Sequence, residues 1–432
     1  MRSETDPETI RSVSGPAPPR SVVVVGAGLA GAQTAAALRA HGFTGRLTLL
    51  GDEGVPPYDR PPLSKELLTR PAPVWLSDDL GVDVAVLADD FRPDDPAVEL
   101  LPGPGVRTAS GERLLADAVV LACGSRPVLP AGWDADVLHT AADADRLRHD
   151  LRPGARTVVV GAGWIGAEIA GVAAGAGADV TVVEAGAAPL VRQLGADVGA
   201  HLVPWYAAAG VRLRLRSPAQ EVAPGGVTLA TGERLAADVV LAAVGARPAT
   251  AWVRRAVPAA LFDAAGGLLV DDDGAVPGVP GLWAVGDVAT RSHPVFGPVP
   301  GGHWSAALHD PDATARAMLG LEPAAAQAPY VFSRQLGHDL ALFGRPDGAP
   351  TAWRGSPGDG PWAAFWPRHD VGDGPSGDGS PDGATAVGAV LLVDSPREVG
   401  AMRKAMNRPH PLRLDLRRAT DPAVRLRDAV VT

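Results

Sequence analysis

The chain has 432 residues, a formal net charge of −10 and a single cysteine, Cys123. This length exceeds what one compact core holds, so we expect two or three domains. A single cysteine excludes an internal disulfide, a zinc site built from several cysteines and a redox dithiol. The acidic balance argues against nucleic acid as the main partner, because binding phosphates needs clustered cations. No apolar run predicts a membrane span and no signal segment is visible, so we expect a cytoplasmic protein with no membrane partner.

The predicted elements begin after residues 1–20, which are rich in Pro, Ser and Arg and which we expect to form a disordered leader. Residues 22–25 are four consecutive valines, a run typical of a parallel strand that is buried on both faces. A predicted helix over 29–41 and a predicted strand over 46–50 complete a βαβ unit. The same order of elements recurs over residues 157–183, so the sequence predicts two similar α/β domains.

Two further strand-like runs, residues 118–122 and 239–244, each end in a turn that contains Gly, Arg and Pro. We interpret each as the end of a nucleotide-binding segment and the start of a crossover. The last hundred residues differ, since residues 330–344 and 386–393 resemble strands separated by sequence rich in Pro, Gly and Asp. The densest part of that sequence, residues 369–383, is expected to be a mobile surface loop.

The first valine run leads directly into a glycine-rich motif, Gly26-Ala27-Gly28-Leu29-Ala30-Gly31. In such a motif the first glycine permits a tight turn, the second lets a pyrophosphate approach the backbone, and the third lets helix and strand pack closely. Asp52 follows the next strand, where an acid accepts hydrogen bonds from an adenosine ribose. The strand, helix, strand and acid together predict a dinucleotide site.

A second motif, Gly161-Ala162-Gly163-Trp164-Ile165-Gly166, has the same context, and Glu184 ends its second strand. Two complete motifs imply two dinucleotides. A carboxylate at Glu184 would repel a ribose phosphate and accept hydrogen bonds from free hydroxyls, which favours NADH over NADPH. The alternative is that Glu184 is an exposed loop acid that contacts nothing.

The run Pro57-Tyr58-Asp59-Arg60-Pro61-Pro62-Leu63-Ser64-Lys65, together with the first glycine motif, resembles the FAD-dependent NAD(P)H:ferredoxin reductase family of two-dinucleotide flavoproteins. The resemblance implies an α/β fold with two Rossmann-like domains and a C-terminal α+β domain. It places FAD in residues 21–127 and 246–326, NADH in residues 128–245, and the C-terminal domain in residues 327–432.

The resemblance also implies a set of site residues. For FAD these are Gly26, Gly28, Leu29, Ala30, Gly31, Asp52, Arg60, Lys65, Gly124, Arg126, Gly286, Asp287, His303, Trp304 and Phe332. For NADH they are Gly161, Gly163, Trp164, Ile165, Gly166, Glu184 and Gly245. Asp287 could also cap a helix, which is compatible with binding FAD, and Trp304 could instead be an ordinary core aromatic residue.

The resemblance further implies that Lys65 and Glu168 are the catalytic pair, with Lys65 beside the edge of the flavin that receives the hydride. Of 39 basic residues only Lys65 and Lys404 are lysines, so a lysine at this position is unusual in this chain. A buried cation needs a carboxylate partner, which Glu168 would supply. The alternative is that Lys65 is a solvated residue at the start of a helix.

The chain departs from the family pattern in several places. Gly302 precedes His303 where the family has an acid, and Pro311 is expected to break the helix that begins near Trp304. Phe332 and Arg334 replace a tryptophan and an acid on the side where an electron acceptor would approach. These departures leave the identity of the partner open. Cys123 stands where the family tends to have threonine and is expected to be a small buried residue.

We therefore expect an NADH-dependent flavoprotein that passes single electrons to a ferredoxin-type iron–sulfur protein feeding an oxygenase, as a monomer or a homodimer. Residues 397–427 hold nine basic and three acidic side chains and could guide an acidic partner, or could be solvated helix surface. The alternatives are an oxidase or quinone reductase, an NADH-sensing flavoprotein of the apoptosis-inducing-factor type, and a relative with a weakened FAD site. No histidine spacing predicts a catalytic metal.

Overall fold

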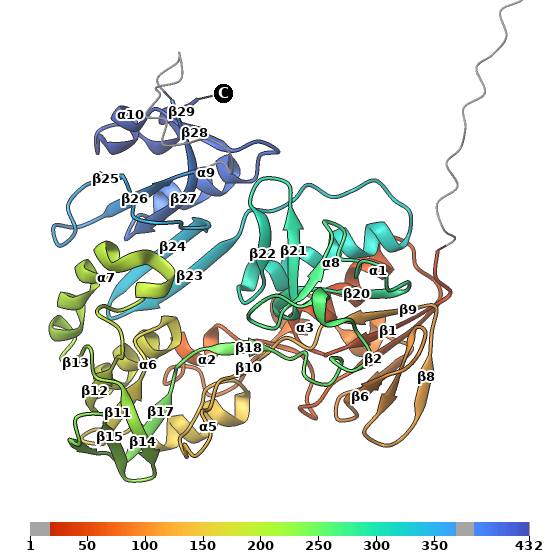
Figure 1. Cartoon of the computed structure of the whole chain (residues 1–432), viewed down its shortest axis with the longest axis horizontal. Helices are drawn as coiled ribbons and strands as arrows, with labels where there is room; N and C mark the ends of the chain where they lie inside the picture. The colour runs from red at the N-terminus through yellow and green to blue at the C-terminus, as the bar shows by residue number, and fades with distance from the viewer. Residues whose placement is uncertain (1–17, 369–383, 432) are drawn as a thin grey trace, which may run out of the picture.

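The computed structural model describes residues 18–368 and 384–431, in which two domains built on parallel sheets are joined to a C-terminal domain (Figure 1). The predicted loop 369–383 and residues 1–17 of the predicted leader lie outside the described residues. One boundary was wrong, because Arg20 belongs to the folded part. Its backbone N–H donates to Asp117 at 2.8 Å, and its carbonyl accepts from Arg46.

The first domain is a parallel sheet in the order β20-β9-β1-β2-β5, so the predicted valine strand is its central strand. Val22 to Val25 are buried, as a strand that is covered on both faces requires. Helix α1 packs against α8 on one face. The bounds are β1 (Ser21–Val25), α1 (Leu29–Ala40), β2 (Arg46–Leu50), β5 (Asp90–Arg92), β9 (Ala118–Leu121), β20 (Leu282–Ala284) and α8 (Trp304–Met318).

The second domain repeats this plan with a parallel sheet in the order β13-β12-β11-β17. A small antiparallel sheet, β14-β15-β16, packs through an apolar cluster against the face that holds Val158 and Val160. The bounds are α5 (Ala141–Asp150), β11 (Arg156–Val160), α6 (Trp164–Gly175), β12 (Asp179–Val183), α7 (Val191–Ala208), β13 (Arg212–Arg214), β14 (Ala219–Ala223), β15 (Gly226–Leu229), β16 (Arg234–Ala236) and β17 (Val239–Ala242).

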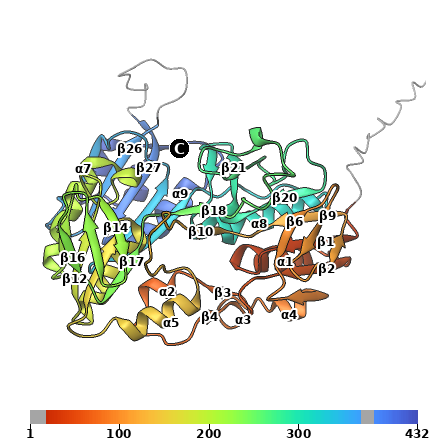
Figure 2. The same cartoon turned by 60° about the horizontal axis from the view of Figure 1, so that its bottom comes forward.

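Two short strands connect these domains. β10 (Ser125–Pro127) leaves the first domain and pairs antiparallel with β18 (Ala246–Pro248), which returns to it. Figures 1 and 2 both show this pair between the two halves of the molecule. The first domain is therefore made of two separate chain segments, because β20 pairs with β9.

The C-terminal domain is an antiparallel sheet in the order β23-β24-β27-β26-β25, extended by β28 and β29. β25 and β26 lie in sequence that we expected to be irregular, because flanking Gly and Pro residues obscure both strands and β26 pairs with the more distant β27. The bounds are β23 (Tyr330–Gln335), β24 (His338–Gly344), β25 (Ala352–Arg354), β26 (Trp362–Pro367), β27 (Thr385–Val393), α9 (Pro396–Met406), β28 (Leu412–Leu414), α10 (Leu416–Thr420) and β29 (Val430–Val431).

The predicted break at Pro311 was wrong, because α8 continues through it from Trp304 to Met318. Proline removes one backbone hydrogen bond from a helix interior. Pro311, Thr314 and Ala315 are buried, and α8 packs against α1, so tertiary packing maintains the helix across the missing bond.

The remaining elements are short. Strands and helices of the first domain and its connections are β3 (Tyr58–Asp59), α2 (Pro62–Lys65), β4 (Val74–Trp75), α3 (Leu76–Asp79), α4 (Val84–Leu87), β6 (Ala97–Leu100), β7 (Gly105–Thr108), β8 (Arg113–Leu115), β19 (Leu268–Val270), β21 (Ala289–His293) and β22 (Gly297–Pro300). Short 3-10 turns occur at Ala259–Leu261, Gly286–Val288 and Leu426–Ala429. Within residues 18–368 and 384–431, no helix has the length and apolar character needed to cross a membrane.

Candidate functional site

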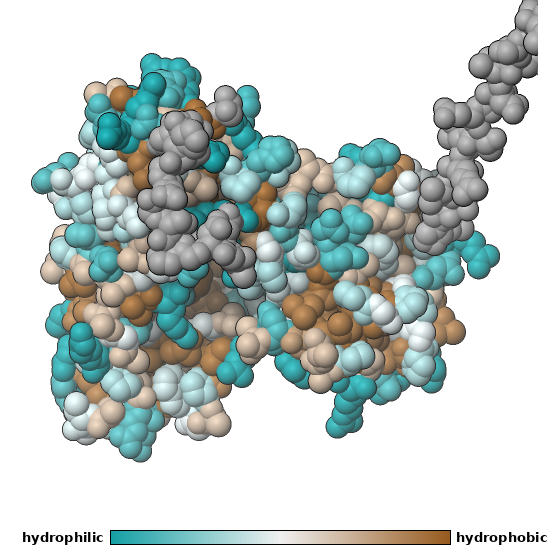
Figure 3. Space-filling model, turned by 45° about the horizontal axis from the view of Figure 1, so that its top comes forward, coloured by the Kyte–Doolittle hydropathy of each residue, from teal (hydrophilic) through white to brown (hydrophobic). Residues whose placement is uncertain are grey.

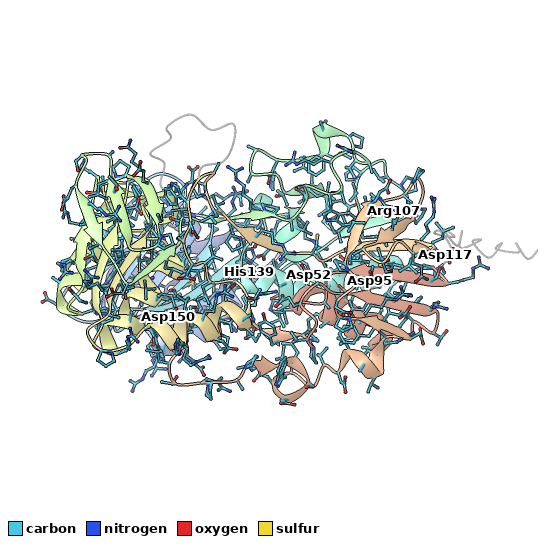
Figure 4. All side chains as sticks on the ribbon, turned by 90° about the horizontal axis from the view of Figure 1, so that it is seen from below. Asp52, Asp95, Arg107, Asp117, His139 and Asp150 are labelled. Carbon is cyan, nitrogen blue, oxygen red and sulfur yellow. The ribbon has the colours of Figure 1, made fainter. Side chains whose placement is uncertain are left out.

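A cavity of about 1290 Å³ lies between the two parallel-sheet domains, and both glycine motifs line it. This volume is larger than the usual range for one small-molecule pocket, ~300 to 1000 Å³. Figure 3 shows the two lobes separated by a notch, and Figure 4 shows Asp52 and His139, which both line the cavity, in the middle of the molecule. Each glycine motif follows the carboxyl end of a parallel strand in its own domain, and both motifs line the cavity.

The first glycine motif forms an open cradle. Gly26 has φ of 111°, a left-handed conformation that favours glycine. A Cβ atom on Gly28 would meet no atom within 4 Å, so this backbone faces open space, whereas one on Gly31 would lie 1.8 Å from the carbonyl oxygen of Gly26. No side chain caps α1 and no acid lies in its first turn, which leaves its N-terminal N–H groups for an anion.

The second glycine motif has the same geometry. Gly161 has φ of 107°, a Cβ atom on Gly163 would meet nothing within 4 Å, and one on Gly166 would lie 2.1 Å from the carbonyl of Gly161. Helix α6 likewise begins without a side-chain cap. The site therefore offers two matching anion cradles in one cavity, which fits two dinucleotides.

The predicted residues line this cavity with three exceptions, Gly31, Gly166 and Gly286. Gly31 and Gly166 serve the close packing of helix on strand that the motif predicts. Gly286, a predicted FAD contact, does not line the cavity. Gly286 has φ of 69°, and its Cβ would lie 3.0 Å from the Cβ of Ala30, so it packs behind the cavity wall.

Charged residues gather beside the first cradle. Asp52 and Arg126 form an ion pair, and Arg60 pairs with Glu53 and donates to the carbonyl of His139. Burial, with Arg60 and Arg126 nearby, lowers the pKa of His139 to about 4, so this imidazole is neutral at pH 7. Sequence reasoning did not identify Glu53 and His139, because neither belongs to a recognisable motif.

Glu184 lies at the end of β12 beside the second cradle. Both of its carboxylate oxygens accept backbone N–H groups at 2.7 Å, one from Ala162 and one from Gly186. The alternative of an exposed acid without contacts was therefore wrong. These bonds orient the carboxylate and leave lone pairs for further donors.

Lys65 and Glu168 form the predicted ion pair, with 2.9 Å between Nζ and Oε1. Glu168 is 2% exposed and Lys65 15% exposed, so the alternative of a solvated lysine was wrong. Ser64 and Ser333 also donate to Glu168. Sequence reasoning missed both serines, because no local pattern distinguishes a serine that binds a distant carboxylate.

Asp287 accepts hydrogen bonds from Ser125 Oγ at 2.9 Å and from the backbone N–H of Gly302 at 3.0 Å. Burial raises its pKa. Asp287 lies inside the short turn Gly286–Val288 and does not cap a helix, so that alternative was wrong. Its position joins the start of β10 to the segment that leads into α8.

Two aromatic side chains at the cavity wall are exposed, Trp304 at 37% and Phe332 at 43%. Trp304 donates its indole N–H to Asp59 at 2.8 Å and is not a core aromatic residue. His303 caps α8 by accepting from the N–H of Ala306 at 3.1 Å. Burial lowers the pKa of His303 to about 4, so it is neutral as well.

Cys123 also lines the cavity, and its thiol contacts the carbonyl of Ala249 at 3.4 Å. Burial raises its pKa to about 11, so the thiol is protonated and a poor nucleophile. In the described part of the chain, no three His, Cys, Asp or Glu residues are placed to hold a metal ion.

Comparison with known proteins places this geometry in a family. Residues 20–309 match the model of the pyridine nucleotide-disulphide oxidoreductases. The ferredoxin–NAD(+) reductase subunit of the benzene 1,2-dioxygenase system of Pseudomonas putida is 34% identical over 346 residues, which are 76% of this chain and 81% of the relative.

A second relative is the ferredoxin–NAD(+) reductase component of the biphenyl dioxygenase system of Paraburkholderia xenovorans (strain LB400). It is 35% identical over 339 residues, covering 76% of this chain and 82% of the relative. Among solved structures, the reductase chain of the covalent putidaredoxin reductase–putidaredoxin complex matches with a TM-score of 0.82 and 26% identity. That match covers 95% of this chain and 98% of the other.

Proposed function

The chain belongs to the pyridine nucleotide-disulphide oxidoreductase family, and on this premise we propose that it is an FAD-dependent reductase that takes electrons from NADH and passes them to a ferredoxin-type iron–sulfur protein of an oxygenase system. The observation that carries the proposal is the single cavity lined by two glycine cradles. A single cavity that holds both dinucleotides would allow their redox-active rings to meet. The names of the relatives, reductase components of dioxygenase systems, support the same partner class.

The residues of the first cradle fit FAD. Gly26, Gly28 and the N-terminus of α1 would hold its phosphates, and Asp52 its ribose. When bound, FAD supplies the step from two-electron to one-electron chemistry. Asp287, which lines the cavity and is fixed by Ser125 and Gly302, would also contact the cofactor.

The second cradle would hold the pyridine nucleotide, with a preference for NADH over NADPH. Glu184 supports this preference, because its carboxylate is fixed by two backbone N–H groups and cannot easily turn away from a ribose phosphate. A free 2′-hydroxyl could instead donate to it.

Lys65 is the cation that we assign to the region where hydride arrives, and Glu168 offsets the cost of burying its charge. The exposed side chains of Trp304 and Phe332 mark the side from which the iron–sulfur protein would approach. Arg334 and the basic segment 397–427 suit an acidic partner.

The chain has too few cysteines to carry out the disulfide exchange after which its family is named. Cys123 is the single cysteine, and burial keeps it protonated. A dithiol relay needs two reactive thiols. The chain therefore cannot supply an internal disulfide relay, which suits transfer to an iron–sulfur protein.

The proposal is tested by anaerobic titration with NADH, followed by flavin absorbance, and then by addition of candidate ferredoxins. We expect complete flavin reduction by NADH and rapid reoxidation by one ferredoxin. Fast turnover with O₂ or quinone and none with ferredoxin would identify an oxidase or quinone reductase. A long-lived charge-transfer complex without turnover would identify a sensing protein, and colourless protein that ignores added FAD would overturn the proposal.

A further inference from the structure

The carboxylate of Glu168 is held from three directions. Oε1 contacts Lys65 Nζ at 2.9 Å and accepts from Ser333 Oγ at 2.5 Å, while Oε2 accepts from Ser64 Oγ. A buried carboxylate is costly unless its charge and its lone pairs are matched. Lysine matches the charge, and the two hydroxyls supply the remaining hydrogen bonds.

Gln335 fixes the direction of the hydrogen bond from Ser333. Strand β23 alternates between exposed and buried side chains from Phe332 onward, which places Ser333 and Gln335 on the same buried face. Gln335 Nε2 donates to Ser333 Oγ at 3.2 Å. An ionised carboxylate can only accept, so the single hydroxyl proton of Ser333 points to Glu168, and the bond from Gln335 holds the Ser333 oxygen through one of its lone pairs.

This cluster joins all three domains. Ser64 and Lys65 come from α2 of the first domain, Glu168 from α6 of the second, and Ser333 from β23 of the C-terminal domain. The approach of α6 to β23 is close, since a Cβ atom on Gly171 would lie 2.9 Å from the backbone nitrogen of Leu336. Packing therefore holds Ser333 against Glu168 and leaves little freedom for either side chain.

We propose that Ser333, oriented by Gln335, is a positioning residue that holds the Glu168 carboxylate in place and thereby fixes the ammonium group of Lys65 at the cavity wall. Lys65 Nζ also lies 5.9 Å from the centre of the Phe332 ring. Two neighbouring residues of β23 therefore contact the charge pair, Phe332 at Lys65 and Ser333 at Glu168. The C-terminal domain, which contributes no glycine cradle, thus helps to hold the charge pair in position at the cavity wall. This inference rests on the proposed role of Lys65 beside a bound flavin.

The first test uses the scarcity of lysine. Lys65 and Lys404 are the only lysines of the chain, and Lys404 is exposed. Trace acetylation with acetic anhydride, read by peptide mass spectrometry on the protein as purified, gives the rate at Lys65 relative to that at Lys404. In Ser333→Ala we expect this ratio to rise about tenfold, the equivalent of one hydrogen bond to a charged group.

Three further variants control the labelling. Gln335→Leu should raise the ratio in the same direction, because Ser333 is then free to turn. Ser333→Thr, which keeps the hydroxyl, should restore the wild-type ratio. Ser356→Ala removes an exposed hydroxyl elsewhere in the C-terminal domain and should change nothing. An unchanged ratio in folded Ser333→Ala protein would overturn the inference.

The second test is the midpoint potential of the bound flavin, measured by anaerobic titration with dithionite. Ser333→Ala should shift the potential to more negative values, in the same direction as Lys65→Met. If Ser333 acts through Lys65, this shift disappears when Ser333→Ala is made in the Lys65→Met background. Equal shifts in both backgrounds would show that Ser333 has only a general structural role.

The two tests separate this inference from the proposed function. Neither uses NADH or a ferredoxin, and the labelling ratio can be read without flavin. A labelling ratio that responds to Ser333→Ala while no ferredoxin is reduced would defeat the proposed partner alone. Rapid ferredoxin reduction with an unresponsive ratio and potential would defeat the positioning role alone.

Discussion

The indole N–H of Trp304 donates to Asp59 across 2.8 Å and ties the start of α8 to strand β3. Burial raises the pKa of Asp59. The bond orients an exposed aromatic side chain at the cavity wall, since a side chain that is 37% exposed has few packing contacts to hold it.

We expect Asp59→Ala to release Trp304 and to lower the free energy of unfolding by about 1 kcal/mol, the usual worth of one hydrogen bond. Asp59→Asn keeps an acceptor at this position and should leave both properties nearly unchanged. The chain has 10 tryptophans, so the indole is best followed by ¹⁹F NMR of fluorotryptophan-labelled protein, with Trp304 assigned through Trp304→Phe. A sharp shift in the Trp304 resonance of Asp59→Asn alone would contradict this assignment.

Gly28 and Gly31 should respond to alanine in opposite ways. A methyl group at Gly28 meets no protein atom, so Gly28→Ala should change the stability of flavin-free protein by less than about 0.5 kcal/mol but weaken FAD binding strongly. Gly31→Ala forces a methyl group against the carbonyl of Gly26 and should cost about 1 to 3 kcal/mol without any ligand. Urea unfolding of flavin-free protein and FAD titration measure the two effects. Equal FAD affinity in wild type and Gly28→Ala would remove the first cradle as the phosphate site.

Lys65→Met should slow flavin reduction by NADH about 10²-fold in stopped-flow absorbance, because a charge aimed at the reacting region is lost. It also leaves Glu168 buried without its cation, at a cost of about 3 to 5 kcal/mol. The double variant Lys65→Met/Glu168→Gln should recover stability but not rate. Lys404→Met is the matched lysine control, and unaltered reduction kinetics in Lys65→Met would exclude Lys65 from the mechanism.

Glu184→Ala should lower the ratio of kcat/KM for NADH over NADPH by about tenfold, because the repulsion of a ribose phosphate is removed. Glu184→Gln keeps the size of the side chain and one oxygen acceptor, and it should lower the ratio too if charge decides the preference. Steady-state rates with each nucleotide measure the ratio. A ratio that stays constant in both variants would show that Glu184 only braces the backbone of Ala162 and Gly186.

His293 predicts a pH dependence of stability. Burial lowers its pKa to about 4, so between about pH 4 and the ordinary value of 6.5 the unfolded chain binds a proton that the folded chain does not. The contribution of His293 to the free energy of unfolding is therefore fully present above pH 6.5. It is lost as the pH falls towards 4, at up to about 1.4 kcal/mol per pH unit. Burial raises the pKa of Asp310 to about 6, which gives a slope of opposite sign over part of this range, so the single-residue comparison is the informative one.

We therefore expect His293→Asn to reduce the slope of unfolding free energy against pH between 4 and 6.5, measured by urea unfolding at several pH values. Asparagine can still accept from the N–H of Val295, which His293 Nδ1 accepts at 3.0 Å. His149→Asn removes an exposed histidine and should leave the slope unchanged. Parallel slopes in wild type and His293→Asn would contradict the prediction.

Local patterns determined much of this molecule. The two valine runs, the glycine spacings after them and the acids at Asp52 and Glu184 are contiguous signals, and each one specifies its own turn and helix start through backbone geometry. That is why both cradles and the strands that flank them in the two parallel sheets were predictable, whereas the edge strands β5 and β13 were not. The pair of Lys65 with Glu168 came from resemblance to a family, and the structure confirms that the pair forms.

Only the tertiary structure decided the features that depend on distant partners. Pro311 is tolerated because α8 packs on α1, and β26 is a strand because β27 pairs with it. Ser64, Glu168 and Ser333 belong to three domains, and nothing around any one of them in the sequence marks it as a partner of the others. The physical reason is that a side chain forms hydrogen bonds with the groups that folding brings within about 3 Å of it. The residues next to it in the sequence do not determine which groups these are.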